Sequence, residues 1–167
     1  PKGVAITHHN VTQLFKITGF FVPRMRAKPV SFAVTQWHSY SFDVSVREIW
    51  GALFFGGRLV IVPEAVAASP TEFHELVANI GQVTVLSQTP SAIGMLASEG
   101  LDSAALMVGG EACSAAVADR WAPGRVLINI YGPTETTVYV ATSRPLSAGS
   151  GVPRSVRRCR ARCCSSS

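Results

Sequence analysis

One stretch of the chain brings together the residue types that a nucleotide site needs. Residues 129–137 read Asn-Ile-Tyr-Gly-Pro-Thr-Glu-Thr-Thr. Tyr131 offers a flat face for a base, and the hydroxyls of Thr134 and Thr136 can donate to phosphate oxygens. Glu135 supplies a hard oxygen ligand of the kind that Mg²⁺ prefers. A polar turn with a threonine cap has the same composition, so the residue types alone leave both interpretations open.

The residues around this stretch predict the element that positions it. Val126, Leu127 and Ile128 indicate a buried strand, and Gly132-Pro133 signals a turn directly after it. Open α/β sheets bind ligands at the carboxyl ends of their strands. We therefore expect residues 129–137 to lie at such an edge.

The rest of the chain predicts an α/β fold. Strand signals at 59–62, 83–87, 106–108 and 126–130 alternate with helix signals at 46–53, 70–80, 90–98 and 114–121. That alternation indicates parallel strands joined by helical crossovers. Ser69, followed by Pro70 and Glu72, is typical of a capped helix start. Prolines and basic residues around 23–29 interrupt any periodicity, and a surface loop is expected there.

The bulk properties indicate one globular unit. The chain has 167 residues, of which 47% are hydrophobic and 15% charged, as is typical of a globular domain. No apolar stretch approaches the roughly 20 residues of a membrane helix, so no membrane partner is expected. The sequence opens at Pro1 without a leader. We interpret the chain as a soluble fragment of a longer protein.

Residues 154–167 form a tail of different composition. The net charge of +5 comes from the arginines after Pro153, because residues 1–152 carry equal numbers of basic and acidic groups. A nucleic-acid-binding protein has support only in this tail, and no nucleic-acid partner is expected. The tail cysteines lack zinc-site spacing, and nothing supports disulfides, which favours a reducing, cytoplasmic setting. The tail is either disordered or read out of frame.

The motif at 129–137 resembles the adenine and magnesium motif of adenylate-forming enzymes, specifically the amino-acid adenylation domains of nonribosomal peptide synthetases. The other matching motifs follow in the family's order: Pro1-Lys2-Gly3-Val4, Phe42-Asp43-Val44-Ser45, Ser87-Gln88-Thr89-Pro90 and Gly109-Gly110-Glu111. The resemblance covers residues 1–153. It implies part of the large N-terminal subdomain of the acyl-CoA synthetase and luciferase type of fold, with parallel-sheet layers and flanking helices.

The resemblance also implies an amino-acid pocket. Asp43 would pair with the substrate ammonium, although a lone aspartate before a helix can also be a cap. The implied lining comprises Val44, Arg47, Ser87, Met107, Gly109, Ile130, Val138 and Tyr139. Arg47 departs from the family pattern, since an aromatic or apolar residue is usual there. It would either select an acidic side chain or damage function.

For ATP, the resemblance implies a second set of residues: Lys2, Gly109, Gly110, Glu111, Asn129, Tyr131, Gly132 and Thr134. Glu135 would hold Mg²⁺, and Thr134, Glu135 and His38 would serve catalysis. Simpler interpretations remain open at Lys2 as a solvated lysine, at Gly109-Gly110 as a tight turn, and at His38 as a structural histidine. His8, His9 and His74 form no metal set, and Cys113 is expected to be a small buried residue.

The implied reaction is amino acid activation with MgATP. An aminoacyl-adenylate and pyrophosphate form, and the aminoacyl group passes to the phosphopantetheine thiol of a peptidyl carrier protein domain. We expect the chain to need the rest of the adenylation domain and to be inactive alone. The alternatives are an acyl-CoA ligase, which Asp43 disfavours, and a non-catalytic remnant.

Overall fold

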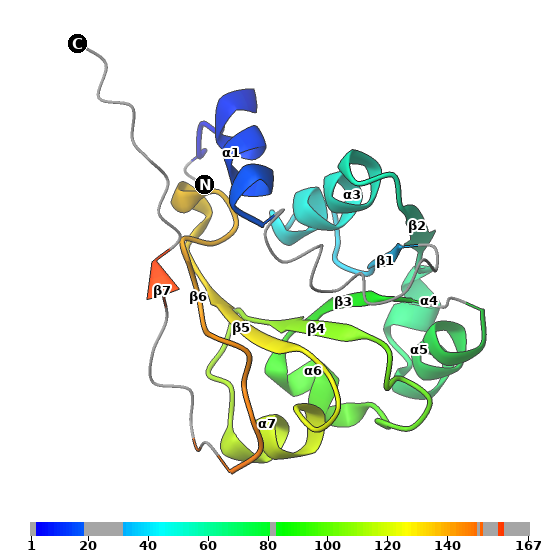
Figure 1. Cartoon of the computed structure of the whole chain (residues 1–167). Coiled ribbons are helices and arrows are strands. Elements are labelled where there is room, and N and C mark those ends of the chain that lie inside the picture. Colours follow the sequence, from blue (N-terminus) through cyan, green and yellow to red (C-terminus); the bar gives the residue numbers. More distant parts are fainter. Residues whose placement is uncertain (1–2, 19–31, 81–82, 150, 152–156, 159–167) are drawn as a thin grey trace.

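The computed structural model describes residues 3–18, 32–80, 83–149, 151 and 157–158, and it has the expected α/β architecture (Figure 1). The strands are β1 (Ala33–Gln36), β2 (Arg58–Ile61), β3 (Val85–Gln88), β4 (Ala105–Val108), β5 (Leu127–Tyr131), β6 (Ala141–Thr142) and β7 (Arg157–Arg158). Their order in the sheet is β2-β1-β3-β4-β5-β6-β7. Strands β1 to β5 pair in parallel, whereas β6 and β7 are antiparallel additions beside β5. The predicted parallel sheet is confirmed.

Helices lie on both faces of this sheet. They are α1 (His8–Thr18), α3 (Val44–Phe54), α4 (Glu64–Ala67), α5 (Pro70–Glu75), the π-helical turn η1 (Leu76–Ile80), α6 (Pro90–Met95), α7 (Ala115–Trp121) and the 3₁₀ turn η2 (Thr134–Thr136). Helices α1 and α3 lie on one face, and α5, α6 and α7 lie on the other (Figure 1). Ser69, Thr89 and Ser114 cap α5, α6 and α7 through their hydroxyls.

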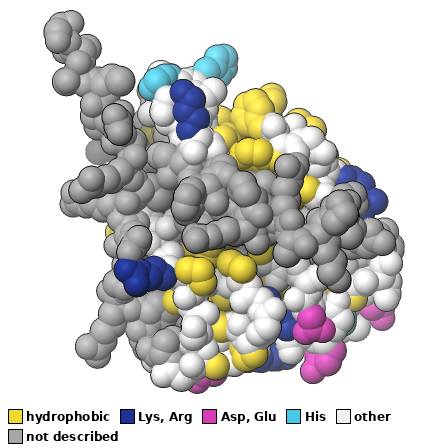
Figure 2. Space-filling model, viewed as in Figure 1, with side chains coloured by type: hydrophobic (Ala, Val, Ile, Leu, Met, Phe, Trp, Pro, Cys, Tyr) yellow, Lys and Arg dark blue, Asp and Glu magenta, His cyan; other side chains and the backbone are white. Residues whose placement is uncertain are grey.

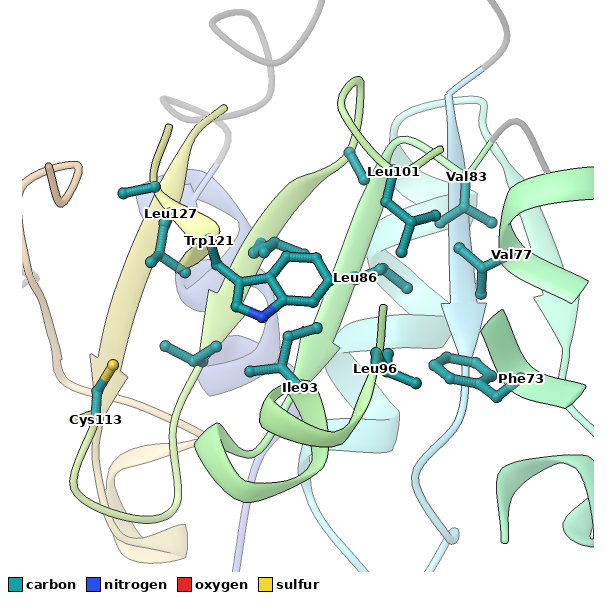
Figure 3. Packing of buried hydrophobic residues seen from close by; sticks show 14 of the residues in the cluster. Phe73, Val77, Val83, Leu86, Ile93, Leu96, Leu101, Cys113, Trp121 and Leu127 are labelled. Atoms are coloured by element: carbon teal, nitrogen blue, oxygen red, sulfur yellow. The ribbon is translucent and has the colours of Figure 1, made fainter. Parts of the chain in front are cut away.

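The main core lies under α5, α6 and α7. Trp121 is fully buried against Leu86, Ile93 and Leu127, and Phe73 and Val77 extend the same cluster (Figure 3). Alternate residues of β3, β4 and β5 supply its sheet side, as the two-residue period of a strand requires. The intervening residues face α1 and α3.

Helix α1 and strand β1 are absent from the sequence-based expectations. Val11, Leu14 and Phe15 have helical spacing, and Thr7 begins the helix by accepting a hydrogen bond from the Asn10 backbone N–H at 3.3 Å. That pattern was the available signal. Strand β1 is four residues long, fully buried and not alternating, so its pattern is weak. The loop expected around 23–29 lies outside the described residues.

Two further differences concern the end of α6 and the C-terminal tail. Helix α6 ends at Met95 rather than at Ser98, because Leu96 has an extended backbone with ψ of 150°. Within residues 154–167, Arg157–Arg158 pair with β6, and the other residues of this tail lie outside the described part. None of the helices in the described ranges is long and apolar enough to cross a membrane.

Candidate functional site

The sheet register brings the sequence motifs to one edge. Gln88 on β3 pairs with Val108 on β4, and Val108 pairs with Asn129 on β5. The strands are parallel, so the residues that follow each of these positions emerge at the same carboxyl edge. Residues 89–90, 109–111 and 130–132, which are remote in sequence, therefore meet where open α/β sheets bind ligands.

Residues 131–136 form the expected turn after β5. The Tyr131 ring is 65% exposed, so one face is available to a ligand. Thr134 and Glu135 are exposed on η2. The Thr136 hydroxyl instead donates to the Pro133 carbonyl at 2.8 Å and serves the turn itself. The exposed carboxylate of Glu135 and the neighbouring exposed hydroxyl of Thr134 are oxygen ligands that suit a Mg²⁺ ion shared with phosphates.

The chain returns from this turn through two residues in the left-handed region. Thr137 has φ of 64° and Val138 has φ of 69°. This conformation is unfavourable for β-branched residues, and such strain is characteristic of functional sites. It turns Val138 and Tyr139 inward, where they are 6% and 3% exposed. Thr137 was not among the predicted site residues, since its type argues against this conformation.

Gly132 and Gly109 allow the backbones at this edge to approach closely. A Cβ on Gly132 would meet the Tyr139 Cα and would lie 2.7 Å from the Val140 nitrogen. A Cβ on Gly109 would lie 2.7 Å from the Ile130 carbonyl oxygen. Both distances are far below contact, so only glycine fits at either position. Because neither glycine has a side chain, the ends of β4 and β5 and the returning chain can pack directly against one another.

Asn129 presents an unpaired acceptor. Its backbone N–H donates to the Ser143 hydroxyl at 2.9 Å, but its buried Oδ1 has no hydrogen-bond partner among the described residues. Buried polar atoms are rarely left unpaired. An amino group of a bound purine would satisfy this oxygen, so the site fits an adenine nucleotide.

Gly110 and Glu111 continue the edge after β4. Gly110 has φ of 86°, which favours glycine. The Glu111 carboxylate accepts a hydrogen bond from the Ser91 hydroxyl at 2.5 Å. Hydrogen bonds from Ser91 and Thr89 lower the pKa of the Glu111 carboxyl. Glu111 therefore connects this turn to the start of α6.

Asp43 lies at the start of α3 but does not cap it. Its backbone is helical, with φ of −64° and ψ of −23°, and its side chain makes no capping hydrogen bond. A capping aspartate has an extended backbone and accepts from an N–H of the first turn. The carboxylate is instead partly exposed at the helix start. The structure removes the capping interpretation of this residue.

The residues predicted to line the amino-acid pocket lie together. Met107, Ile130, Val138 and Tyr139 belong to one buried cluster, and Val44 packs against it. Leu14 and Phe15 of α1 and Ile128 of β5 also belong to this cluster, and none of the three was among the predicted lining residues. The cluster is mostly apolar with few polar groups, as small-molecule sites are.

Arg47 and Ser87 are the polar members of this set. Arg47 is only 9% exposed, and its Nη1 donates to the Ser87 hydroxyl at 2.7 Å. Its Nη2 contacts the sulfur of Met107. Arg47 thus extends from α3 toward Ser87 on β3 and Met107 on β4.

His38 follows β1 and is held by Glu48, a residue that the sequence-based site did not include. The His38 Nδ1 lies 2.8 Å from the Glu48 carboxylate, which is completely buried. The same carboxylate accepts from the backbone N–H groups of Trp37 and His38 at 3.3 and 3.2 Å. An acid in the middle of a largely apolar helix was the available signal. His38 is therefore fixed beside the strand edge by two hydrogen bonds to Glu48, and a third holds the neighbouring Trp37 backbone.

The remaining predicted residues lie elsewhere. Lys2 is outside the described residues. In the described ranges no three His, Cys, Asp or Glu residues cluster as metal ligands, so Glu135 would act as a single protein ligand. His8 and His9 are exposed, and the His74 Nε2 lies 2.9 Å from the Glu99 carbonyl. Cys113 is 3% exposed, as expected, and burial raises the pKa of its thiol.

Comparison with known proteins agrees with this geometry. The family described as AMP-binding enzyme matches residues 1–162. The chain belongs to this family. It is 59% identical over 153 residues to the isonitrile lipopeptide synthase of Mycobacterium tuberculosis, covering 92% of this chain and 6% of that protein. It is 43% identical over 155 residues to a dimodular nonribosomal peptide synthase of Bacillus subtilis, covering 84% of this chain and 6% of that protein.

Solved adenylation-domain structures share the fold of this AMP-binding chain. The Vibrio cholerae adenylation domain AlmE, in complex with glycyl-adenosine-5'-phosphate, superposes with a TM-score of 0.79 at 27% identity, over 96% of this chain and 31% of that one. A four-domain nonribosomal peptide synthetase bound to AMP and glycine gives 0.78 at 26% identity, over 92% and 12%. The expected resemblance to nonribosomal peptide synthetase adenylation domains is confirmed. The chain spans a small part of the relatives that it matches.

Proposed function

We propose that this chain forms the substrate-binding part of a longer enzyme that activates an amino acid with ATP. The observation that carries the proposal is the Asp43 carboxylate, which does not cap its helix and lies at the start of α3 next to Val44 and the apolar cluster. A bound ammonium needs such a partner, because an unpaired charge out of water is very unfavourable. A fatty or aryl acid has no ammonium group that could pair with the Asp43 carboxylate.

The proposed reaction joins the amino acid carboxylate to the α-phosphate of ATP and releases pyrophosphate. A carboxylate is already a competent nucleophile, so the residues bind and orient rather than remove a proton. Asp43 accepts the ammonium, Asn129 and Tyr131 bind the adenine, and the Thr134 hydroxyl donates to a phosphate oxygen. Glu135 would hold Mg²⁺, which supplies a positive charge for the phosphates. His38, fixed by Glu48, lies beside the same strand edge and orients the carboxylate.

The activated product is a mixed anhydride that a thiol can attack. We propose a carrier-protein phosphopantetheine as that thiol, in agreement with the nonribosomal peptide synthetases among the relatives. Residues 1–153 form the adenylation part in this proposal, and residues 154–167 lie outside it.

Amino-acid-dependent ATP–pyrophosphate exchange tests the proposal. The enzyme that contains this chain should exchange pyrophosphate with at least one amino acid, and Asp43→Asn should lower the rate by roughly 100-fold, because a charged partner is lost. Asp102→Asn is the matched control, since the Asp102 side chain is 83% exposed and pairs with Arg125, so its replacement should have little effect. Exchange with fatty or aryl acids but with no amino acid would contradict the proposal.

A further inference from the structure

Arg47 is a buried cation that has no anionic partner among the described residues. Its side chain is 9% exposed, its hydrogen-bond partner is the neutral Ser87 hydroxyl, and its Nε has no partner among the described residues. Elsewhere in the described ranges, ion pairs join His38 to Glu48 and Arg125 to Asp102, and Arg47 takes part in neither. A hydroxyl and a thioether do not balance the charge of a guanidinium, and an arginine cannot lose its proton.

Asp43 lies four residues before Arg47 on the same side of α3, yet the two do not pair. Opposite charges at this spacing are neighbours and commonly interact. Here Arg47 extends toward Ser87 on β3 and Met107 on β4, while Asp43 remains at the helix start. The anion and the cation at the start of α3 are therefore kept apart. Val44, which lies between them in the sequence, packs against the apolar cluster.

We propose that the site selects an amino acid with an acidic side chain, aspartate or glutamate, whose side-chain carboxylate pairs with Arg47. The inference rests on the proposed function, in which Asp43 takes the ammonium and the α-carboxylate faces ATP at the strand ends. With both of those groups engaged, the side-chain carboxylate is the anion left to reach Arg47. The substrate thus supplies the negative charge that Arg47 does not find in the described part of the chain.

The surroundings of Arg47 strengthen this pairing. Met107, which contacts the guanidinium, is 1% exposed, and Arg47 itself is only 9% exposed, so access of water to the guanidinium is limited. An ion pair is stronger in such surroundings than in water. A guanidinium also offers a planar pair of N–H donors that matches a carboxylate, and the unpartnered Nε supplies one of them. A neutral amide of the same shape could not balance the charge.

Pyrophosphate exchange with matched substrates tests the selection. The enzyme that contains this chain is assayed with aspartate, glutamate, asparagine, glutamine, leucine and lysine. One of the two acids should exceed its amide in kcat/KM by roughly 100-fold, the usual scale for a desolvated charge pair. Arg47→Met should lower the value for that acid by roughly 100-fold and leave the amides within a few-fold. Arg47→Lys should retain part of the preference, because it keeps the charge but loses the planar fork.

Arg125→Met is the control for a lost arginine, because Arg125 pairs with Asp102 and the Leu101 carbonyl, away from the site. It should leave the order of substrates unchanged. The rise in melting temperature with aspartate or glutamate measures binding independently of turnover, and it should disappear in Arg47→Met while the variant itself remains folded.

Three outcomes would overturn the inference. Exchange that favours leucine, lysine or an amide over both acids would do so and leave the proposed function intact. An equal loss for every amino acid in Arg47→Met would show that Arg47 acts on a group that all substrates share. Exchange with no amino acid at all would contradict the proposed function, and the inference would fall with it.

Discussion

The face of the sheet that carries α5, α6 and α7 is apolar throughout its main cluster, whereas the face beneath α1 and α3 contains buried charged groups. On the first face Trp121, Leu86 and Leu127 interlock and are completely buried. On the second, Arg47, Ser87 and Glu48 are buried between apolar neighbours. Both faces use alternate residues of the same strands, such as Leu106 and Met107. The first face therefore supplies most of the apolar core, whereas the second contains the residues that bind the amino acid in the proposed function.

The surface shows the same difference. Hydrophobic side chains gather on the surface beside α1 and α3 in Figure 2. On α3, Trp50, Leu53 and Phe54 are 43%, 54% and 51% exposed, and the Trp50 and Phe54 rings stack with centroids 5.2 Å apart. On the opposite face Trp121, Leu86 and Phe73 are at most 2% exposed. The outer side of α3 thus contributes little to the core.

The largest effect is expected from Trp121→Ala. Removal of this fully buried ring should lower the free energy of unfolding by about 3–5 kcal/mol, because it leaves a large cavity. Trp50→Ala, the matched control on the other face, should cost about 1 kcal/mol or less. Urea unfolding followed by circular dichroism measures both. Equal losses would show that the two faces contribute alike.

Glu48→Gln should have the next largest effect. The glutamine amide keeps the shape of the side chain but replaces the charged carboxylate, which accepts three hydrogen bonds from Trp37 and His38. The expected loss in the free energy of unfolding is about 1–3 kcal/mol. Glu64→Gln, an exposed position at the start of α4, is the control and should be close to neutral. A neutral result for Glu48→Gln in the same unfolding experiment would contradict the positioning role of this carboxylate.

Arg47→Met, unlike the two preceding substitutions, should increase the stability of the fold. Replacing an unpaired buried charge by a methionine should raise the free energy of unfolding by about 1 kcal/mol. Arg125→Met should lower it by a similar amount, since Arg125 is hydrogen-bonded and lies over the Trp121 ring at 5.1 Å. If Arg47→Met destabilises as much as Arg125→Met, Arg47 has a structural partner and the contrast between the faces fails.

The smallest effect concerns the pH dependence at Glu111. Because its pKa is lowered in the folded state, its contribution to stability is present above the unfolded pKa and is lost as pH falls through the folded pKa. Ser91→Ala removes the hydrogen bond from the Ser91 hydroxyl, which is the largest cause of the lowered pKa, and should raise the Glu111 pKa toward its ordinary value. Nuclear magnetic resonance titration of the carboxyl measures this. Ser103→Ala, on an exposed residue after Leu101, should leave the Glu111 titration unchanged, and a shift there would point to a global change.

The sequence was sufficient for features that depend on neighbours in the chain. The strand at 106–108, the hydroxyl cap at Ser69, and the turn at Gly132 follow from local patterns. The partners of Arg47 come from residues 40 and 60 positions away, and no local pattern contains them. Glu48 was missed for the same reason, since its role is set by the end of β1. The left-handed Thr137 and Val138 contradict their own propensities and are imposed by the surrounding packing.

The contact between Gly132 and Tyr139 closes residues 132–139 into a loop with a fixed base. One side of this loop carries Thr134 and Glu135, and the other carries Val138 and Tyr139, which belong to the apolar cluster. In the proposed function the first side binds the phosphates of ATP and the second lines the amino-acid pocket, so one short loop positions the two substrates relative to each other.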